Sequence, residues 1–196
     1  MSTYASTNLT HATLTLIYYP NPFALTCNKS NHFCNNTFRQ NKTKMNTSIV
    51  MYTDGAAQGN PGKGGYGVVL LSPPYRKELS EGFRLTTNNR MELLAVIKGL
   101  EALKNDGCDV VVYSDSKYVV DAVEKGWVFG WEKKQFKEKK NPDLWRRFLV
   151  VYRRHKVKFV WVKGHDGNTE NERCDRLAVA AANSPALKED IGYTAM

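Results

Sequence analysis

Four acidic residues stand where carboxylates are uncommon, at the ends of apolar segments that are far apart in the chain. They are Asp54, Glu92, Asp115 and Asp175. Hard divalent cations prefer oxygen ligands, and Mg²⁺ usually takes only a few carboxylates and leaves its other positions to water and substrate phosphate. Each residue taken singly could equally be a helix cap or a turn residue. The set of four predicts a magnesium site, provided that the fold brings them together.

The local sequence indicates how each carboxylate is positioned. Asp54 is expected to end an apolar strand and to enter a glycine-rich turn, and Asp115 to end a second apolar strand. Glu92 is expected in the first turn of a helix, and Asp175 at the start of the last helix. Positions at the ends of buried elements would allow distant segments to contribute to one site.

Hydrophobic periodicity predicts the elements that must carry these residues. The expected strands cover residues 48–53, 65–71, 78–85, 109–114 and 157–162, and the expected helices cover residues 89–104, 116–125, 142–154 and 171–183. Gly- and Pro-rich turns join the first three strands as antiparallel hairpins, and the fourth strand reads as buried on both faces. Asn88 or Asn89 is the expected N-cap of the first helix. The order predicts an α/β fold with a five-stranded mixed sheet, three antiparallel strands then two parallel ones, flanked by helices.

Composition restricts the class of protein. The 196 residues include 28 Lys and Arg against 19 Asp and Glu, and a pI near 9.4 favours a polyanionic partner. No run of 18 apolar residues occurs, so no membrane span is predicted. The four cysteines show no framework spacing, which favours reduced thiols in a reducing compartment such as the cytoplasm.

Residues 1–46 differ from the rest of the chain. They contain no Asp or Glu, are rich in Ser, Thr and Asn, and show no sustained periodicity, which is typical of a disordered leader. Three interpretations remain open: a transit peptide, which would make the protein organellar; a small metal knuckle that uses Cys27, His32 and Cys34, although their spacing matches no common zinc site; or a misassigned start upstream of Met45. The catalytic domain is expected to cover residues 47–196.

Four motifs carry a resemblance to a known family. They are YTDGAAQGNPGKGGYG, TTNNRMEL, YSDSKYV and WVKGHDGNTENERCD. In this order they resemble bacterial-type ribonuclease HI over about residues 48–193. That family cuts the RNA strand of RNA–DNA hybrids. The resemblance therefore implies a monomeric endoribonuclease without sequence specificity, which leaves 5′-phosphate and 3′-hydroxyl ends.

The resemblance also assigns roles to the site residues. The family's four acidic positions bind two Mg²⁺ ions, for which Mn²⁺ can substitute, and they match the four carboxylates one by one. Asp54 would bridge both ions, Glu92 and Asp115 would hold the leaving-group side, and Asp175 would hold the ion that activates water. His165 lies in a glycine-flanked loop and matches a histidine that passes a proton or helps to release product. The alternative for His165 is an exposed loop residue.

Polar residues near the site are expected to recognise the hybrid. Asn60, Asn88 and Asn89 suit a minor groove that displays 2′-hydroxyl groups, although turn formation and capping would also explain them. The resemblance places Thr87 and Asn141 in a pocket for a phosphate of the DNA strand.

The chain departs from the family pattern at two of the expected substrate contacts. Leu85 stands where the phosphate pocket often has Arg. Lys117 stands where a Gln often contacts the minor groove, two residues after Asp115. The phosphate pocket and the groove contacts are therefore expected to differ from the family pattern.

A basic segment with interleaved aromatic residues follows. Residues 127–156 contain ten basic and three acidic side chains, and begin with Trp127. The lysines that surround Phe136 are Lys133, Lys134, Lys137, Lys139 and Lys140. They match a basic protrusion with which the family grips the DNA strand through backbone phosphates. A solvated charged face is the alternative.

A function of another class remains to be weighed against the enzyme. The domain could bind RNA–DNA hybrids without cleaving them, as a catalytically silent module. Such a module would be expected to have lost a carboxylate, and none of the four is missing.

Overall fold

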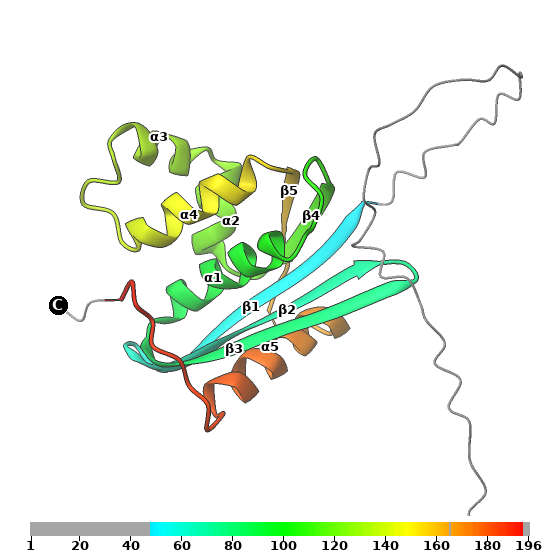
Figure 1. Cartoon of the computed structure of the whole chain (residues 1–196), viewed down its shortest axis with the longest axis vertical. Helices are drawn as coiled ribbons and strands as arrows, with labels where there is room; N and C mark the ends of the chain where they lie inside the picture. Colours follow the sequence, from blue (N-terminus) through cyan, green and yellow to red (C-terminus); the bar gives the residue numbers. More distant parts are fainter. Residues whose placement is uncertain (1–47, 165, 194–196) are drawn as a thin grey trace, which may run out of the picture.

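The computed structural model describes residues 48–164 and 166–193, in which five strands form one mixed sheet (Figure 1). The strands are β1 (Ile49–Gly59), β2 (Gly62–Ser72), β3 (Tyr75–Thr86), β4 (Asp109–Ser114) and β5 (Lys156–Trp161). They lie in the order β3-β2-β1-β4-β5, with β1, β2 and β3 antiparallel and β1, β4 and β5 parallel. The predicted α/β fold with three antiparallel and two parallel strands is confirmed. The interpretations of residues 1–46 concern a part of the chain outside this description.

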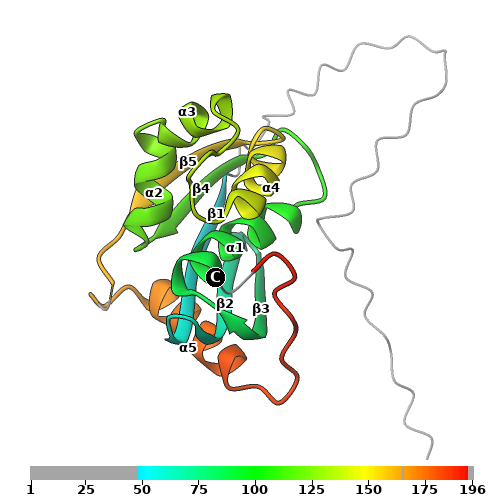
Figure 2. The same cartoon turned by 90° about the vertical axis from the view of Figure 1, so that its left-hand side faces the viewer.

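Helices cover both faces of the sheet (Figures 1 and 2). One side carries α1 (Asn88–Glu101), α2 (Lys117–Glu124), α3 (Trp127–Lys133) and α4 (Pro142–Tyr152), and the other side carries α5 (Thr169–Ala182). The hydrophobic core includes Met51 of β1, Leu93 and Ile97 of α1, and Trp145 of α4, all fully buried. This core fixes the helices on the sheet, and with them the side chains of the predicted site.

The first strand is longer than the sequence predicted. It does not end before Asp54 but continues to Gly59, so Asp54 lies inside β1, directly opposite Gly67 of β2. The chain reverses at Asn60 and Pro61, after Gly59 with its φ of 93°, a left-handed conformation that favours glycine. The expected turn after Asp54 is therefore wrong, because the glycines there continue the strand.

Two glycines of the β1–β2 hairpin, one in each strand, allow helices to approach it closely. A methyl group on Gly55 would overlap the backbone of α1 at Glu92, and one on Gly67 would overlap the carbonyl group of Cys174 in α5. Glycine is needed here for space rather than for chain reversal. The spacing sets how near Glu92 of α1 and Asp175 of α5 come to β1.

Replacement of Gly67 by Ala is expected to destabilise the fold. The added carbon must push α5 away from β2, which costs about 1–3 kcal/mol for overpacking of this kind. Thermal unfolding followed by circular dichroism measures the loss. Gly130→Ala in α3 is the matched control, because no atom lies within 4 Å of its added carbon, and alanine favours a helix by up to about 1 kcal/mol. Equal melting temperatures for the two variants would contradict this account of the β2–α5 contact.

Helix starts differ from the prediction at both helices that carry carboxylates. The N-cap of α1 is Thr87, not Asn88 or Asn89, and Glu92 is the fifth helical residue, just beyond the first turn. Helix α5 begins at Thr169 because the Asn168 side chain caps it and accepts hydrogen bonds from the backbone amides of Glu170 and Asn171. Asp175 is therefore in the second turn of α5 rather than at its start.

Two further elements correct the sequence interpretation. Helix α3 was not predicted, because its seven residues bury only Val128 and show no apolar periodicity. Strand β4 alternates between buried and half-buried residues instead of being buried on both faces, because α5 packs over β1, β2 and β3. Cys108 and Cys174 carry free thiols, as expected. None of the helices in the described part of the chain is long and apolar enough to cross a membrane.

Candidate active site and substrate interface

Asp54 is the centre of a cluster of negative charge. Burial raises its pKa, and the charges of Asp115, Asp175 and Glu92 raise it further, to about 8, against a hydrogen bond from the Gly55 amide that lowers it. These three carboxylates come from the residue after β4, from α5 and from α1. Like charges shift a pKa strongly only when they are near. The other three predicted carboxylates are therefore near enough for their charges to act on Asp54.

Glu92 is fixed by two hydrogen bonds. Its Oε2 accepts from the Ser116 hydroxyl at 2.6 Å, and its Oε1 accepts from the Asn88 amide at 2.9 Å. Burial raises the pKa of Glu92, the two hydrogen bonds oppose the rise, and the charge of Asp115 adds to it. The carboxylate is therefore held in one orientation although its own charge is disfavoured.

Asp115 follows β4 directly and lies under the loop between β5 and α5. Its Oδ2 accepts from Asn171 Nδ2 at 3.4 Å, and its backbone carbonyl accepts from the Trp161 indole at 3.0 Å. A side chain on Gly164 would come within 2.7 Å of the Asp115 carboxylate. The loop therefore passes close to the site at Gly164. His165, the next residue, is outside the described part of the chain.

Sequence reasoning missed Ser116 and Asn171 as supports of the carboxylates. Ser116 is the N-cap of α2, where its hydroxyl also accepts from the Val119 amide at 3.3 Å. A capping serine beside an acidic residue is the signal that could have found it. Asn171 is buried, and its Oδ1 has no partner among the described residues. Only the tertiary structure, which places Asn171 of α5 beside the residue after β4, reveals that contact.

The donor set fits hard divalent cations. Four carboxylates supply the oxygen ligands that such ions prefer, and burial together with the charges of the other three carboxylates raises the pKa of Asp54. Within residues 48–164 and 166–193, however, no group of three or more acidic, His or Cys side chains is arranged to hold an ion by itself. An ion here would need water or substrate phosphate to complete its ligands.

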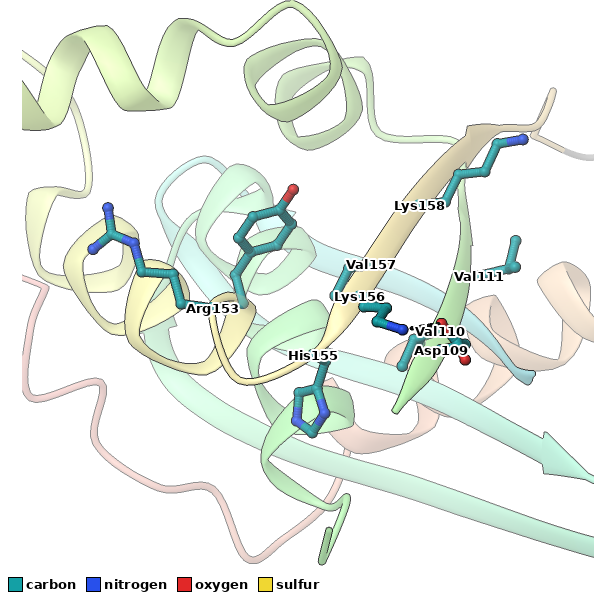
Figure 3. A pocket seen from close by; sticks show the side chains of 9 residues that line it. Asp109, Val110, Val111, Arg153, His155, Lys156, Val157 and Lys158 are labelled. Carbon is teal, nitrogen blue, oxygen red and sulfur yellow. Dashed lines mark ion pairs between the residues drawn. The ribbon is translucent and has the colours of Figure 1, made fainter. Parts of the chain in front are cut away.

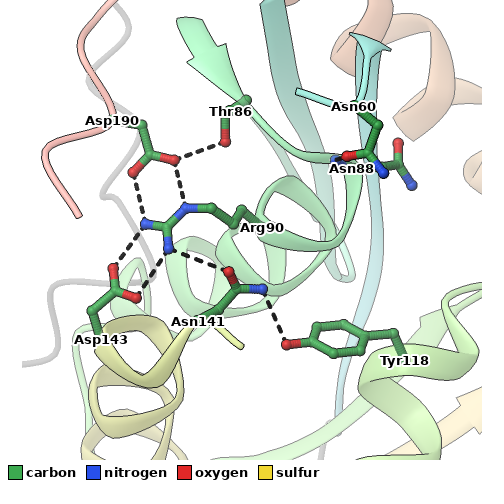
Figure 4. Close-up of polar contacts among 8 residues, drawn as sticks. All are labelled: Asn60, Thr86, Asn88, Arg90, Tyr118, Asn141, Asp143 and Asp190. Carbon is green, nitrogen blue, oxygen red and sulfur yellow. Dashed lines mark hydrogen bonds and ion pairs between the residues drawn. The ribbon is translucent and has the colours of Figure 1, made fainter. Parts of the chain in front are cut away.

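Four of the predicted substrate contacts line one cavity of about 810 Å³. Asn60 comes from the β1–β2 turn, Thr87 and Asn89 from the start of α1, and Asn141 from the N-cap of α4. Other lining residues bring positive charge: Lys139, Lys140 and Arg146. A cavity with amide, hydroxyl and cationic groups fits an anion. Figure 4 draws Asn60 and Asn141 of this lining, together with Asn88.

The other predicted contacts do not line this cavity. Asn88 donates its side-chain amide to Glu92 and its backbone amide to Asn60 Oδ1 at 3.4 Å. Lys117 places its ammonium 5.1 Å from the ring centre of Trp161, which is 45% exposed. Trp127, also exposed, packs under Lys125. These residues border the carboxylates or the start of α3 instead.

The basic segment is anchored by an aromatic residue, and Lys139 places its ammonium 5.4 Å from the ring centre of Trp131. Phe136 is buried, and the Arg146 guanidinium lies 5.3 Å from its ring centre. The exposed lysines at the end of α3 and in the following loop form no ion pair in the described part of the chain; they are Lys133, Lys134, Lys137, Lys139 and Lys140. We call these five residues the lysine protrusion. Their charges remain available for phosphates.

A second cavity lies where β4 and β5 begin, at the end of these strands opposite to Asp115 (Figure 3). It has a volume of about 460 Å³ and is lined by Asp109, Tyr152, His155 and neighbouring residues. His155 is buried, its ring nitrogens have no partner among the described residues, and burial lowers its pKa. No predicted site residue lines this cavity, so it is separate from the carboxylates.

Close relatives share most of the domain. The ribonuclease H of Desulforamulus reducens is 59% identical over 157 residues, which cover 76% of this chain and 98% of that protein. The ribonuclease H of Trichodesmium erythraeum is 54% identical over 156 residues, which cover 77% of this chain and 99% of that protein. The matched length excludes about a quarter of this chain.

Solved structures of RNase H enzymes have the same fold as this chain. LC9-RNase H1, a type 1 RNase H with the type 2 active-site motif, has a TM-score of 0.64 and 32% identity over 70% of this chain and 72% of its own. LC11-RNase H1 in complex with an RNA/DNA hybrid has a TM-score of 0.55 and 28% identity over 69% and 97%. The family model for RNase H matches residues 46–183. By sequence, fold and the arrangement of its carboxylates, this chain belongs to the RNase H family.

Proposed function

We propose that this protein is an endoribonuclease that hydrolyses the RNA strand of RNA–DNA hybrids. One observation carries the proposal: besides burial, the charges of Asp115, Asp175 and Glu92, which come from the end of β4, from α5 and from α1, each raise the pKa of Asp54 in β1. Membership of the RNase H family supports the substrate, since relatives carry that name and one structural neighbour binds an RNA/DNA hybrid. A silent hybrid-binding module is less well supported, because all four carboxylates are retained.

The carboxylates are proposed to hold two Mg²⁺ ions, with Mn²⁺ as a substitute. Asp54 would contact both ions, Glu92 and Asp115 one, and Asp175 the other. Such a pair of ions supplies an activated water and stabilises the leaving oxygen of phosphodiester hydrolysis. Cleavage of the bond to the 3′ oxygen would then leave 5′-phosphate and 3′-hydroxyl ends.

The surrounding residues keep these ligands in place. Ser116 and Asn88 orient the Glu92 carboxylate, and Asn171 orients Asp115. His165 is proposed to pass a proton or to assist product release, since its neighbour Gly164 lies against Asp115. The unbalanced negative charge of the site also predicts weak metal binding until substrate phosphate adds ligands.

Recognition of the hybrid is proposed to divide between two surfaces. Asn60, Asn88 and Asn89 at the turn and the start of α1 would contact 2′-hydroxyl groups in the minor groove, which distinguish RNA from DNA. Asn88 also bonds Glu92, so a groove contact would be coupled to the active site. The cavity at Thr87 and Asn141 would take a phosphate of the DNA strand, and the lysine protrusion would contact further phosphates.

Cleavage of three labelled duplexes tests the proposal. With Mg²⁺, the protein is expected to cut the RNA strand of an RNA–DNA hybrid at many positions and to leave RNA and DNA duplexes intact. A label at the 3′ end of the RNA marks the downstream fragment, and its sensitivity to phosphatase identifies a 5′-phosphate end. Binding of the hybrid without cleavage would favour the silent module, and equal cleavage of the RNA duplex would contradict the proposed substrate.

A further inference from the structure

Arg90 of α1 is a buried cation whose hydrogen-bonding capacity is fully used (Figure 4). Its side chain is 2% exposed. It donates to Asp190 at 2.7 and 2.8 Å, to Asp143 at 3.0 and 2.8 Å, and to Asn141 Oδ1 at 3.5 Å. A guanidinium has five N–H groups, and these five contacts use all of them. Arg90 therefore has no donor left for a phosphate.

Asp190 reaches Arg90 from the C-terminal segment, which we define as residues 187–193. This segment runs beside β3, where Lys188 exchanges two backbone hydrogen bonds with the strand at 2.8 and 2.9 Å. The Thr86 hydroxyl then donates to Asp190 Oδ2 at 2.7 Å, and the Asp190 side chain is 8% exposed. The segment is thus fastened where β3 ends and α1 begins.

The contacts of Asn141 determine which way its amide points. Because Arg90 can only donate, the atom of Asn141 that faces it must be the oxygen. On the other side, Asn141 Nδ2 donates to the Tyr118 hydroxyl at 3.1 Å, and this hydroxyl also accepts from the Trp145 indole at 2.8 Å. The Asn141 side chain makes no capping hydrogen bond to α4. One of its two amide hydrogens is therefore left at the wall of the 810 Å³ cavity.

We propose that Arg90 and Asp190 are positioning residues that hold the Asn141 amide ready to donate to a phosphate of the DNA strand. The C-terminal segment is then part of the substrate site, although it carries no catalytic group. This inference rests on the proposed function, because it takes the occupant of the cavity to be a phosphate of the hybrid. Arg90 acts through Asn141 and does not touch the phosphate.

Asp190→Asn tests this role, because it keeps the shape of the side chain and removes its charge. On electrostatics alone, loss of an acidic residue near a nucleic-acid surface tightens binding. Positioning predicts the opposite: a Kd for the hybrid about tenfold higher, the effect of losing one hydrogen bond to a charged group. Binding is measured by fluorescence anisotropy in EDTA, where no cleavage occurs. With Mg²⁺, KM is expected to rise in parallel and kcat to stay within about twofold.

Glu189→Gln is the matched control. It removes one carboxylate from the adjacent position, where Glu189 pairs with Arg84 and both side chains are exposed. Its Kd is expected to equal that of the parent or to be lower. If Asp190→Asn binds as Glu189→Gln does, the positioning role is refuted.

A double variant separates positioning from a general loss of structure. Asn141→Ala should itself weaken binding, and Asp190→Asn should add nothing further in that background, because the residue through which it acts is gone. Additive losses would overturn the proposal. Tyr118→Phe loosens the amide from its other side without touching the ion cluster, and it should also raise Kd. Tyr118→Phe replaces Asp190→Asn as the test variant if Asp190→Asn does not fold at the assay temperature.

A scan of single methylphosphonates along the DNA strand locates the phosphate. At one position the neutral linkage should weaken binding by the parent and have little effect on Asp190→Asn. The same profile for both proteins would contradict the inference. If the parent neither binds nor cleaves the hybrid, the proposed function itself has failed, and this outcome is distinct from a parent that is active with a variant that matches it.

Discussion

Replacement of Asp54 by Asn is expected to abolish cleavage of the hybrid while leaving the fold intact. The amide cannot supply the negative charge with which Asp54 would hold the metal ions, so several kcal/mol of transition-state stabilisation should be lost. The rate should fall at least about a thousandfold in Mg²⁺. Hybrid affinity should stay within about tenfold, because phosphates and grooves are contacted elsewhere.

The same substitution should raise stability when no metal is present. The folded-state pKa of Asp54 is about 8, above its ordinary value of 3.8, so the folded protein holds a proton that the unfolded chain releases. This group favours the folded state below its ordinary pKa, and that contribution is lost as the pH rises through about 8. Asn at this position does not titrate. At pH 8 in EDTA the variant should therefore melt higher than the parent, by a few degrees for about 1–3 kcal/mol.

Two measurements together test the predicted effects of Asp54→Asn on catalysis and on stability. Single-turnover cleavage in Mg²⁺ gives the catalytic loss, and melting temperatures across the range from pH 5 to pH 9 in EDTA give the stability effect. The parent should lose stability toward high pH more steeply than Asp54→Asn. Asp121→Asn, which removes a carboxylate of an i,i+4 ion pair on α2, is the control and should retain activity. Full activity of Asp54→Asn in Mg²⁺ would contradict the assignment of the active site.

Removal of the lysine protrusion should weaken binding without slowing chemistry. Changing all five lysines to Ala removes five unpaired positive charges from one surface. Each phosphate contact releases about 0.9 of a counterion, so the slope of log Kd against log salt should flatten by up to about four. KM should rise at least about tenfold at moderate salt, and kcat on saturating hybrid should stay within about twofold.

The control for this prediction removes the same number of positive charges from another part of the surface. Lys156 and Lys158 lie exposed on β5, outside the lysine protrusion, and Lys156 forms an ion pair with Asp109 at 3.7 Å. Their double Ala variant is compared with Lys133→Ala/Lys134→Ala, so that both proteins lose two charges. Only the second should change the salt slope by more than about one. Equal slopes for the two would show that the protrusion is a solvated face.

Sequence alone predicted the chemistry that is proposed for this protein. Carboxylates at the ends of apolar segments, together with four motifs in one order, were enough to select Asp54, Glu92, Asp115 and Asp175. Periodicity placed the sheet and most helices within a few residues, because a strand or helix with a buried face must repeat its apolar side chains at a fixed period. The cluster of charge around Asp54 agrees with that selection.

Only the tertiary structure decided how those residues are supported. Gly55 after Asp54 reads locally as part of a turn, yet it continues β1, where α1 occupies the space above it, as α5 does above Gly67 of β2. Ser116 and Asn171 were not selected, since their contacts with Glu92 and Asp115 join elements that are distant in the chain. A repeat pattern specifies which face of an element is buried. It does not specify which atoms meet across two packed elements, because that depends on strand register and on the distance between helix and sheet.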